Sequence, residues 1–242
     1  MEDGEEILID YHAVQDALIA ISEYFGRDTG FGISAIALFH DFSTLDRSGP
    51  SYHLRGALLR AGKHAEEFVK GLQSLPQEYQ KPSFQCLSDY EKCMTSGTSK
   101  IACASLLAID IANQIIPFAY ALTVLGQRAP TLELREASQG FLRVLTRSQK
   151  EQQPTQLQQE HQSAIPKDAA LIPSPFQDAA ANTFAKACKS LPSEFKQQIS
   201  QAYSDYKESV IQGNDHVECT SLLAYSIFQP LSSFKDGRDG EK

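Results

Sequence analysis

Four residues in the first half of the chain combine histidine and carboxylate side chains in a spacing that could hold a metal ion. His40 and Asp41 close the apolar run Ala35–Phe39. His12 lies 28 residues before His40, and Asp110 lies 69 residues after Asp41 in another apolar segment. Imidazole and carboxylate groups together can bind a divalent metal and leave positions for water, which the metal makes nucleophilic. The chemistry predicted for such a site is the hydrolysis of a phosphoester.

This pattern resembles that of the HD-domain metal-dependent phosphohydrolases, all-helical enzymes in which a His, an adjacent His-Asp pair and a distant Asp gather a divalent metal. The resemblance spans residues 12–110. It implies that His12, His40, Asp41 and Asp110 are the metal ligands. The alternative interpretation places His40 and Asp41 at the end of an amphipathic helix and makes Asp110 a buried residue bonded to a neighbouring helix.

The chain contains none of the other common catalytic signatures. It has no G-x-S-x-G elbow, no glycine-rich phosphate loop and no H-E-x-x-H motif. The leading hypothesis is therefore a non-enzymatic helical interaction protein: an adaptor, a regulator or a pathogen effector that binds a protein partner, without a cofactor. The alternatives are the metal-dependent phosphohydrolase, with a divalent metal as its cofactor, and a helical structural protein that assembles with copies of itself.

Composition narrows the classes of partner. The net charge of −8 argues against nucleic-acid binding, because proteins that neutralise phosphates need clustered lysine and arginine. The segment 106–125 is apolar enough to raise the question of a membrane span, but Asp110, Asn113, Gln114 and Pro117 interrupt it, so a buried central helix over Ile101–Leu125 is predicted instead. We expect no nucleic-acid partner and no membrane span.

Cysteine usage and the first residues bear on localisation. Five cysteines form no C-x-x-C pair, and an odd number cannot all pair within one chain. Cys103 and Cys219 are predicted to be small buried residues. The first residues are acidic and lack an apolar core, so no secretory signal peptide is expected. These features predict the cytoplasm or another reducing compartment, with export by a signal-independent route left open.

One stretch of the chain occurs twice. Residues 65–108 align with residues 181–224 without a gap, at a constant offset of 116, and 17 of the 44 positions are identical. Each copy predicts three helices, which are separated by a Leu-Pro corner and by a glycine. Apolar residues elsewhere recur at helical spacing. The chain is therefore predicted to be all-α, a bundle of about nine helices containing two related three-helix modules.

This pattern predicts the following division of the chain. Residues 1–150 hold an N-terminal helix pair, the first module and one more helix. Residues 151–174 form a linker rich in glutamine and proline. Residues 175–234 form the second module, which packs on the first, and residues 235–242 are a polar tail.

Most of the shared residues have a structural explanation. The Ser-Leu-Leu-Ala segment that begins at Ser105 is predicted to form a packing face. The Asp-Tyr pair that begins at Asp89 has two interpretations: a tyrosine ring in the core with its hydroxyl at the rim, or a repeated surface contact. Function is then expected where the copies differ, as at Pro82 and Gln198, Lys100 and His216, and Asp110 and Ser226.

Overall fold

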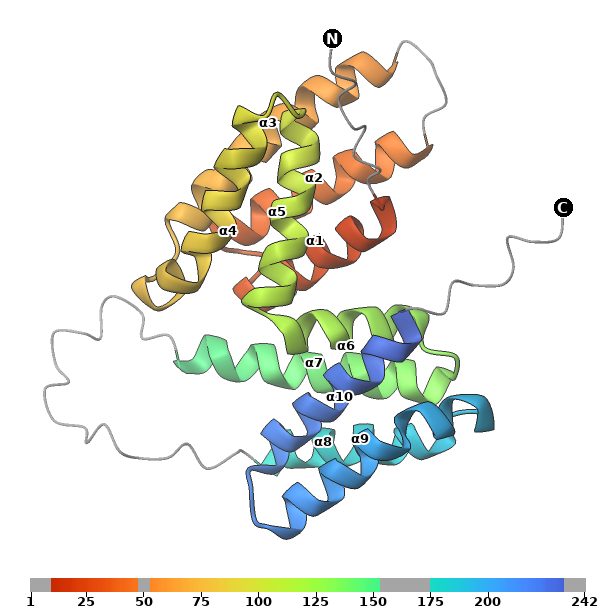
Figure 1. The fold of residues 1–242 in the computed structure, drawn as a ribbon. Coiled ribbons are helices and arrows are strands. Elements are labelled where there is room, and N and C mark those ends of the chain that lie inside the picture. The colour runs from red at the N-terminus through yellow and green to blue at the C-terminus, as the bar shows by residue number, and fades with distance from the viewer. Residues whose placement is uncertain (1–9, 48–52, 153–174, 233–242) are drawn as a thin grey trace, which may run out of the picture. The chain divides into compact units, whose positions relative to one another are not determined.

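The computed structural model describes residues 10–47, 53–152 and 175–232. These residues form ten α-helices and one 3-10 helix, and they contain no strand (Figure 1). The all-α prediction is confirmed. The helices are α1 (Tyr11–Phe25), α2 (Gly30–Arg47), α3 (His53–Gln73), α4 (Gln77–Thr95), α5 (Lys100–Gln114), α6 (Pro117–Arg128), α7 (Leu132–Gln152), α8 (Pro175–Ala187), η1 (Cys188–Ser190), α9 (Ser193–Ile211) and α10 (His216–Ser232).

The apolar segment Ile101–Leu125 is divided between two helices, and the prediction of one central helix is wrong. α5 ends at Gln114 and α6 begins at Pro117. The residue before a proline is disfavoured in the helical conformation, whereas proline itself suits the first position of a helix. Within the described ranges, no single helix is long and apolar enough to cross a membrane, and α5 with α6 meets those criteria only as a bent pair.

The helix ends follow from local side-chain chemistry. The Asp10 carboxylate accepts hydrogen bonds from two backbone N–H groups in the first turn of α1, and the Ser99 hydroxyl accepts one in the first turn of α5. Gly97 and Gly213 follow α4 and α9 with φ of 83° and 82°, a region that L side chains rarely adopt. These residues therefore set where the helices begin and end.

The chain divides into two compact units, Met1–Tyr120 (unit 1) and Ala121–Lys242 (unit 2). In unit 1, α2 packs on α1 and α3, while α5 packs on α1, α3 and α4. In unit 2, α8 packs on α7 and α10, and α10 packs on α9. The division predicted from the sequence placed α7 with the first module. Residues 153–174 of the predicted linker and the predicted tail 235–242 lie outside the described residues.

The two three-helix modules have matching helix ends. α4 spans 77–95 and α9 spans 193–211, a shift of 116 at both ends, and α5 and α10 begin at 100 and 216 with the same shift. The corner prolines also share one backbone conformation, with φ −52° and ψ 152° at Pro76 and φ −54° and ψ 153° at Pro192. Corresponding residues of the two modules therefore occupy corresponding helix positions.

Phenylalanine rings occupy equivalent places in the two cores. Phe68 of α3 and Phe184 of α8 are fully buried and lie 116 residues apart. The Phe68 ring stacks on Phe31 of α2 at 5.0 Å between centroids, and the Phe184 ring meets Phe141 of α7 at 5.9 Å. Each module is thus anchored to the helix that precedes it by an aromatic pair, and such pairs add about 0.5–1.5 kcal/mol to the burial of the rings.

Candidate functional site

The four predicted metal ligands are distributed over three helices of unit 1. His12 on α1 and His40 on α2 are exposed, whereas Asp41 is buried and Asp110 on α5 is half-buried. All four belong to the described residues 10–47, 53–152 and 175–232. Within these ranges, no three His, Cys, Asp or Glu side chains form a group that could hold a metal ion. The described residues therefore add no support to the divalent metal of the phosphohydrolase hypothesis.

Asp41 instead forms a charge cluster that the sequence analysis missed. Its Oδ2 lies 2.6 Å from His64 Nδ1, and its Oδ1 lies 3.7 Å from Arg60 Nε. Both partners belong to α3, so the cluster ties α2 to α3. A buried carboxylate is tolerated when both of its oxygens meet such groups. The sequence did not indicate the helix pairing that brings His64 to Asp41.

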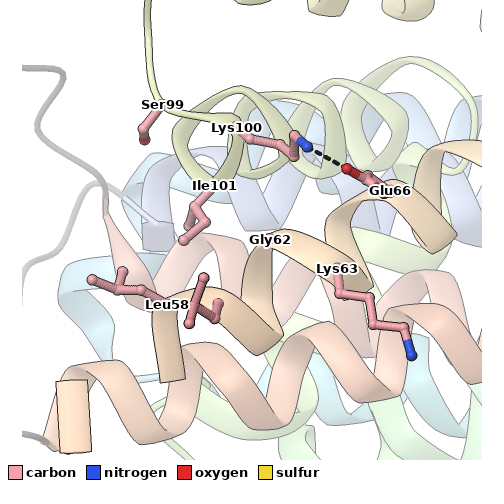
Figure 2. A pocket seen from close by; sticks show the side chains of 8 residues that line it. Leu58, Gly62, Lys63, Glu66, Ser99, Lys100 and Ile101 are labelled. Carbon is pink, nitrogen blue, oxygen red and sulfur yellow. Dashed lines mark hydrogen bonds and ion pairs between the residues drawn. The ribbon is translucent and has the colours of Figure 1, made fainter. Parts of the chain in front are cut away.

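A pocket of about 420 Å³ lies between α3 and the first turn of α5 (Figure 2). Its walls combine apolar and charged side chains. The lining residues are Leu58, Leu59, Gly62, Lys63, Glu66, Ser99, Lys100 and Ile101. The Lys100 ammonium forms an ion pair with Glu66 at the pocket edge, as the dashed line in Figure 2 shows. This hydrogen bond lowers the pKa of Glu66 and raises that of Lys100.

The corresponding corner of unit 2 also places a basic side chain at the start of its third helix. His216 Nδ1 lies 3.6 Å from Asp178 Oδ1, and His216 Nε2 lies 2.9 Å from the Tyr206 hydroxyl. His216 corresponds to Lys100. In both modules, the first residue of the third helix therefore pairs with a carboxylate of the first helix. Lys100 and His216 differ in type, as the alignment showed, but they have the same structural role.

Two exposed side chains of α4 recur on α9 with the same hydrogen bond. The Gln85 amide donates to the Asp89 carboxylate at 2.8 Å, and the Gln201 amide donates to the Asp205 carboxylate at 2.7 Å. In unit 1, Lys92 also donates to Asp89 at 2.8 Å. The bonds from Lys92 and then Gln85 lower the pKa of Asp89. Each module therefore presents an oriented carboxylate to solvent.

A leucine of the repeated Ser-Leu-Leu-Ala segment is also exposed in both units. Leu106 on α5 is 39% exposed and Leu222 on α10 is 50% exposed, whereas Leu107 and Leu223 are buried. The prediction that the whole segment forms a packing face is therefore wrong for one of its two leucines. Neighbouring leucines in a helix point about 100° apart, so only one can face the core.

In unit 1, this leucine and the carboxylate lie on paired helices, each about one turn from the Cys93–Cys103 contact. Cys93 on α4 and Cys103 on α5 have Cα atoms 5.6 Å apart, and the two helices run antiparallel. One turn back along α4 is Asp89, and one turn forward along α5 is Leu106. Asp110 follows one turn later, and its pKa is raised by burial and then by the nearby Asp89.

We call these exposed side chains the repeated face. It consists of Gln85, Asp89 and Leu106 in unit 1 and of Gln201, Asp205 and Leu222 in unit 2. It is amphipathic: each copy contributes a carboxylate held by an amide and an exposed apolar side chain. The tyrosine after each Asp is half-buried, and burial raises the pKa of Tyr90 and of Tyr206.

The cysteines fall into two groups. Cys93 and Cys103 form a disulfide, which the predicted role of Cys103 as a small buried residue did not anticipate. Cys86, Cys188 and Cys219 are buried thiols. Burial raises the pKa of Cys86 to about 11 and that of Cys188 to about 12. The spacing of ten residues carries no disulfide signature, because the contact depends on two helices folding against each other.

Comparison with protein-family models, with curated proteins and with solved structures finds no match for this chain. No related protein therefore supplies a function. The repeated face, the pocket and the charge cluster around Asp41 are the features of the described residues from which a function can be proposed.

Proposed function

We propose that this protein is a helical interaction protein, which acts as an adaptor, a regulator or an effector by binding a protein partner through the repeated face. The observation that carries the proposal is that this face combines exposure with identity between the copies. Leu106 and Leu222 are exposed and identical, although 27 of the 44 aligned positions differ.

Folding alone gives little reason for that identity. A Gln–Asp pair four residues apart on a helix adds only about 0.2–0.5 kcal/mol to helix stability, and many other pairs would serve equally well. Leu106 and Leu222 each leave a large part of their surface exposed in the isolated protein, and substitutions at surface positions usually change stability by less than about 0.5 kcal/mol. A contact made in both units would account for the retention of both features.

The chemistry of the face indicates the kind of partner. The Asp205 carboxylate meets Gln201 through Oδ1, and no other hydrogen bond or ion pair involves Asp205 within the described residues. A lysine or arginine of the partner can therefore pair with this carboxylate while an apolar side chain covers Leu222. We propose a partner segment, such as an amphipathic helix, that carries a basic residue beside an apolar one.

The proposal is tested by partner capture followed by binding measurements with purified components. The immobilised full-length protein captures the partner, and mass spectrometry identifies it. Affinity is then compared for wild type, for the double variant Leu106→Asp with Leu222→Asp, and for Leu132→Asp as a control, since Leu132 is also an exposed leucine, at 63%. Circular dichroism establishes that each variant is folded.

We expect the double variant to weaken binding by at least about tenfold, about 1.4 kcal/mol, because each substitution puts an unpaired carboxylate where the partner's apolar side chain would pack. The control should bind like wild type. Unchanged affinity in the double variant would refute the proposal. The molar mass of the protein alone is also measured at increasing concentration. A mass that rises in wild type but not in the double variant would identify a second copy of the chain as the occupant and exclude a distinct partner.

A further inference from the structure

The disulfide of unit 1 closes a short loop between α4 and α5. Cys93 lies near the end of α4, and Cys103 lies in the first turn of α5. The nine residues between them include Ser99, Lys100 and Ile101, which line the pocket on α3. The disulfide therefore fixes the turn that carries part of the pocket wall, one helical turn away from the repeated face of unit 1.

Unit 2 shows the same hairpin without a disulfide. Ser209 and Cys219 stand at the positions of Cys93 and Cys103, and the Cys219 thiol donates to the Ser209 hydroxyl at 3.1 Å. The helix ends correspond at an offset of 116, and the turn glycines differ by 1° in φ. This hairpin geometry therefore does not depend on a covalent link between the two helices.

The other thiols of the chain are poorly placed for exchange. Thiol–disulfide exchange requires a thiolate to reach a sulfur atom. Cys86 and Cys188 are buried, and burial raises the pKa of both. Cys219 is buried as well. Cys103 is fully buried, whereas Cys93 is half-buried, so Cys93 is the end of the disulfide assigned to attack.

We propose that Cys93–Cys103 is a reversible thiol–disulfide site whose co-reactant is a small thiol such as glutathione, and that unit 1 stays folded in both states. A glutathione thiolate attacks Cys93 Sγ, the S–S bond breaks, and Cys103 leaves as a thiolate that takes up a proton. A second glutathione thiolate attacks the glutathione sulfur of the mixed disulfide, which releases Cys93 and one glutathione disulfide. Two glutathiones are oxidised as one protein disulfide is reduced.

Reduction has a structural consequence that unit 2 does not share. It releases the turn 94–102 from its covalent link to α4, so the pocket wall and the adjacent repeated face of unit 1 gain freedom. An effect of this release on partner affinity rests on the proposed function. The exchange chemistry itself is measured on the protein alone, so it can fail or hold independently of any partner.

The test is to equilibrate the full-length protein in glutathione buffers that run from mainly reduced to mainly oxidised. Acid quenching, alkylation under denaturing conditions and intact-mass measurement then count the thiols. We expect two species that differ by two alkyl groups, with the same ratio reached from either direction. The helical circular dichroism signal should be equal in both states, and backbone hydrogen exchange over residues 94–102 should be faster in the reduced state.

Two variants make the test independent of a folding defect. Cys93→Ser reproduces the arrangement of unit 2 and should give one species in every buffer, with the wild-type dichroism. Ser209→Cys should create a second disulfide with Cys219 and add two more exchangeable thiols. The proposal is overturned if Cys93 and Cys103 remain reduced in the oxidised buffer, if the disulfide resists every reduced buffer, or if reduction removes the helical signal.

Discussion

The side-chain amide of Gln85 donates a hydrogen bond to the Asp89 carboxylate at 2.8 Å, and 116 residues later Gln201 makes the same bond to Asp205 at 2.7 Å. Both bonds lie on the exposed side of the second helix of a module. The third helix of each module carries an exposed leucine, Leu106 or Leu222. The repeat thus carries a duplicated surface as well as a duplicated core.

The equivalent phenylalanines Phe68 and Phe184 should make comparable contributions to their units. Both are fully buried, so replacement by alanine removes apolar contacts and leaves a cavity. We expect Phe68→Ala and Phe184→Ala each to lower the free energy of unfolding by about 3–5 kcal/mol in urea denaturation. Phe84→Ala is the control, since Phe84 is 73% exposed, and it should change stability by less than about 0.5 kcal/mol. A large effect at Phe84 would contradict the placement of the core.

Substitution of the turn glycines should lower stability because of their backbone conformation alone. No atom lies within 4 Å of a Cβ built at Gly97 or Gly213, yet both have a positive φ. We expect Gly97→Ala and Gly213→Ala each to cost about 1 kcal/mol or more. Gly140→Ala, at an open site inside α7, should instead stabilise the protein by about 0.5–1 kcal/mol. The same sign for all three substitutions would contradict this account.

The sequence predicted the helices well and their contacts poorly. Leu-Pro and glycine are local signals, and they separate the helices of each module as predicted. The single helix predicted over Ile101–Leu125 failed because a continuous apolar pattern outweighed Pro117. In the structure, the restriction on the residue before proline separates α5 from α6.

The candidate site was less predictable because it depends on which helices meet. The repeat was visible in the sequence, but Leu106 and Leu107 are the same residue type, and only packing determines which one is exposed. The disulfide between Cys93 and Cys103 likewise needs the hairpin. The sequence suggested Asp41 as a metal ligand but did not indicate its pairing with His64, which lies on another helix.

The Asp41–His64 pair should matter for stability, whereas His40 should not. His64→Ala leaves a buried carboxylate whose remaining ion-pair partner among the described residues is the more distant Arg60. We expect a loss of about 1–3 kcal/mol in thermal or urea denaturation. His40→Ala, at the exposed neighbouring position, should change stability by less than about 0.5 kcal/mol. A bound divalent metal that His40→Ala removes would instead support the phosphohydrolase hypothesis.

Asp110 should make stability depend on pH. Burial, followed by the proximity of Asp89, raises the pKa of Asp110 above its ordinary value of 3.8. The folded state then binds this proton more tightly than the unfolded chain does, so stability is lost as pH rises through the folded pKa. We expect Asp110→Asn to be more stable than wild type at pH 7.

The advantage of Asp110→Asn should shrink as the pH falls through the folded pKa and below 3.8, because wild-type Asp110 is protonated in both states only below that value. Melting temperatures measured across this range test the prediction. Glu91→Gln, at an exposed position of α4, serves as the control for a change of net charge. An advantage that is independent of pH, or equal in the two variants, would contradict the assignment to Asp110.

The number of partner molecules bound per chain tests the repeated face most directly. Native mass spectrometry with the purified partner should show two molecules of the partner segment on the wild-type chain. One molecule should remain on Leu106→Asp or on Leu222→Asp, and none on the double variant. A single molecule on wild type that neither substitution removes would contradict the claim that each unit presents a binding face.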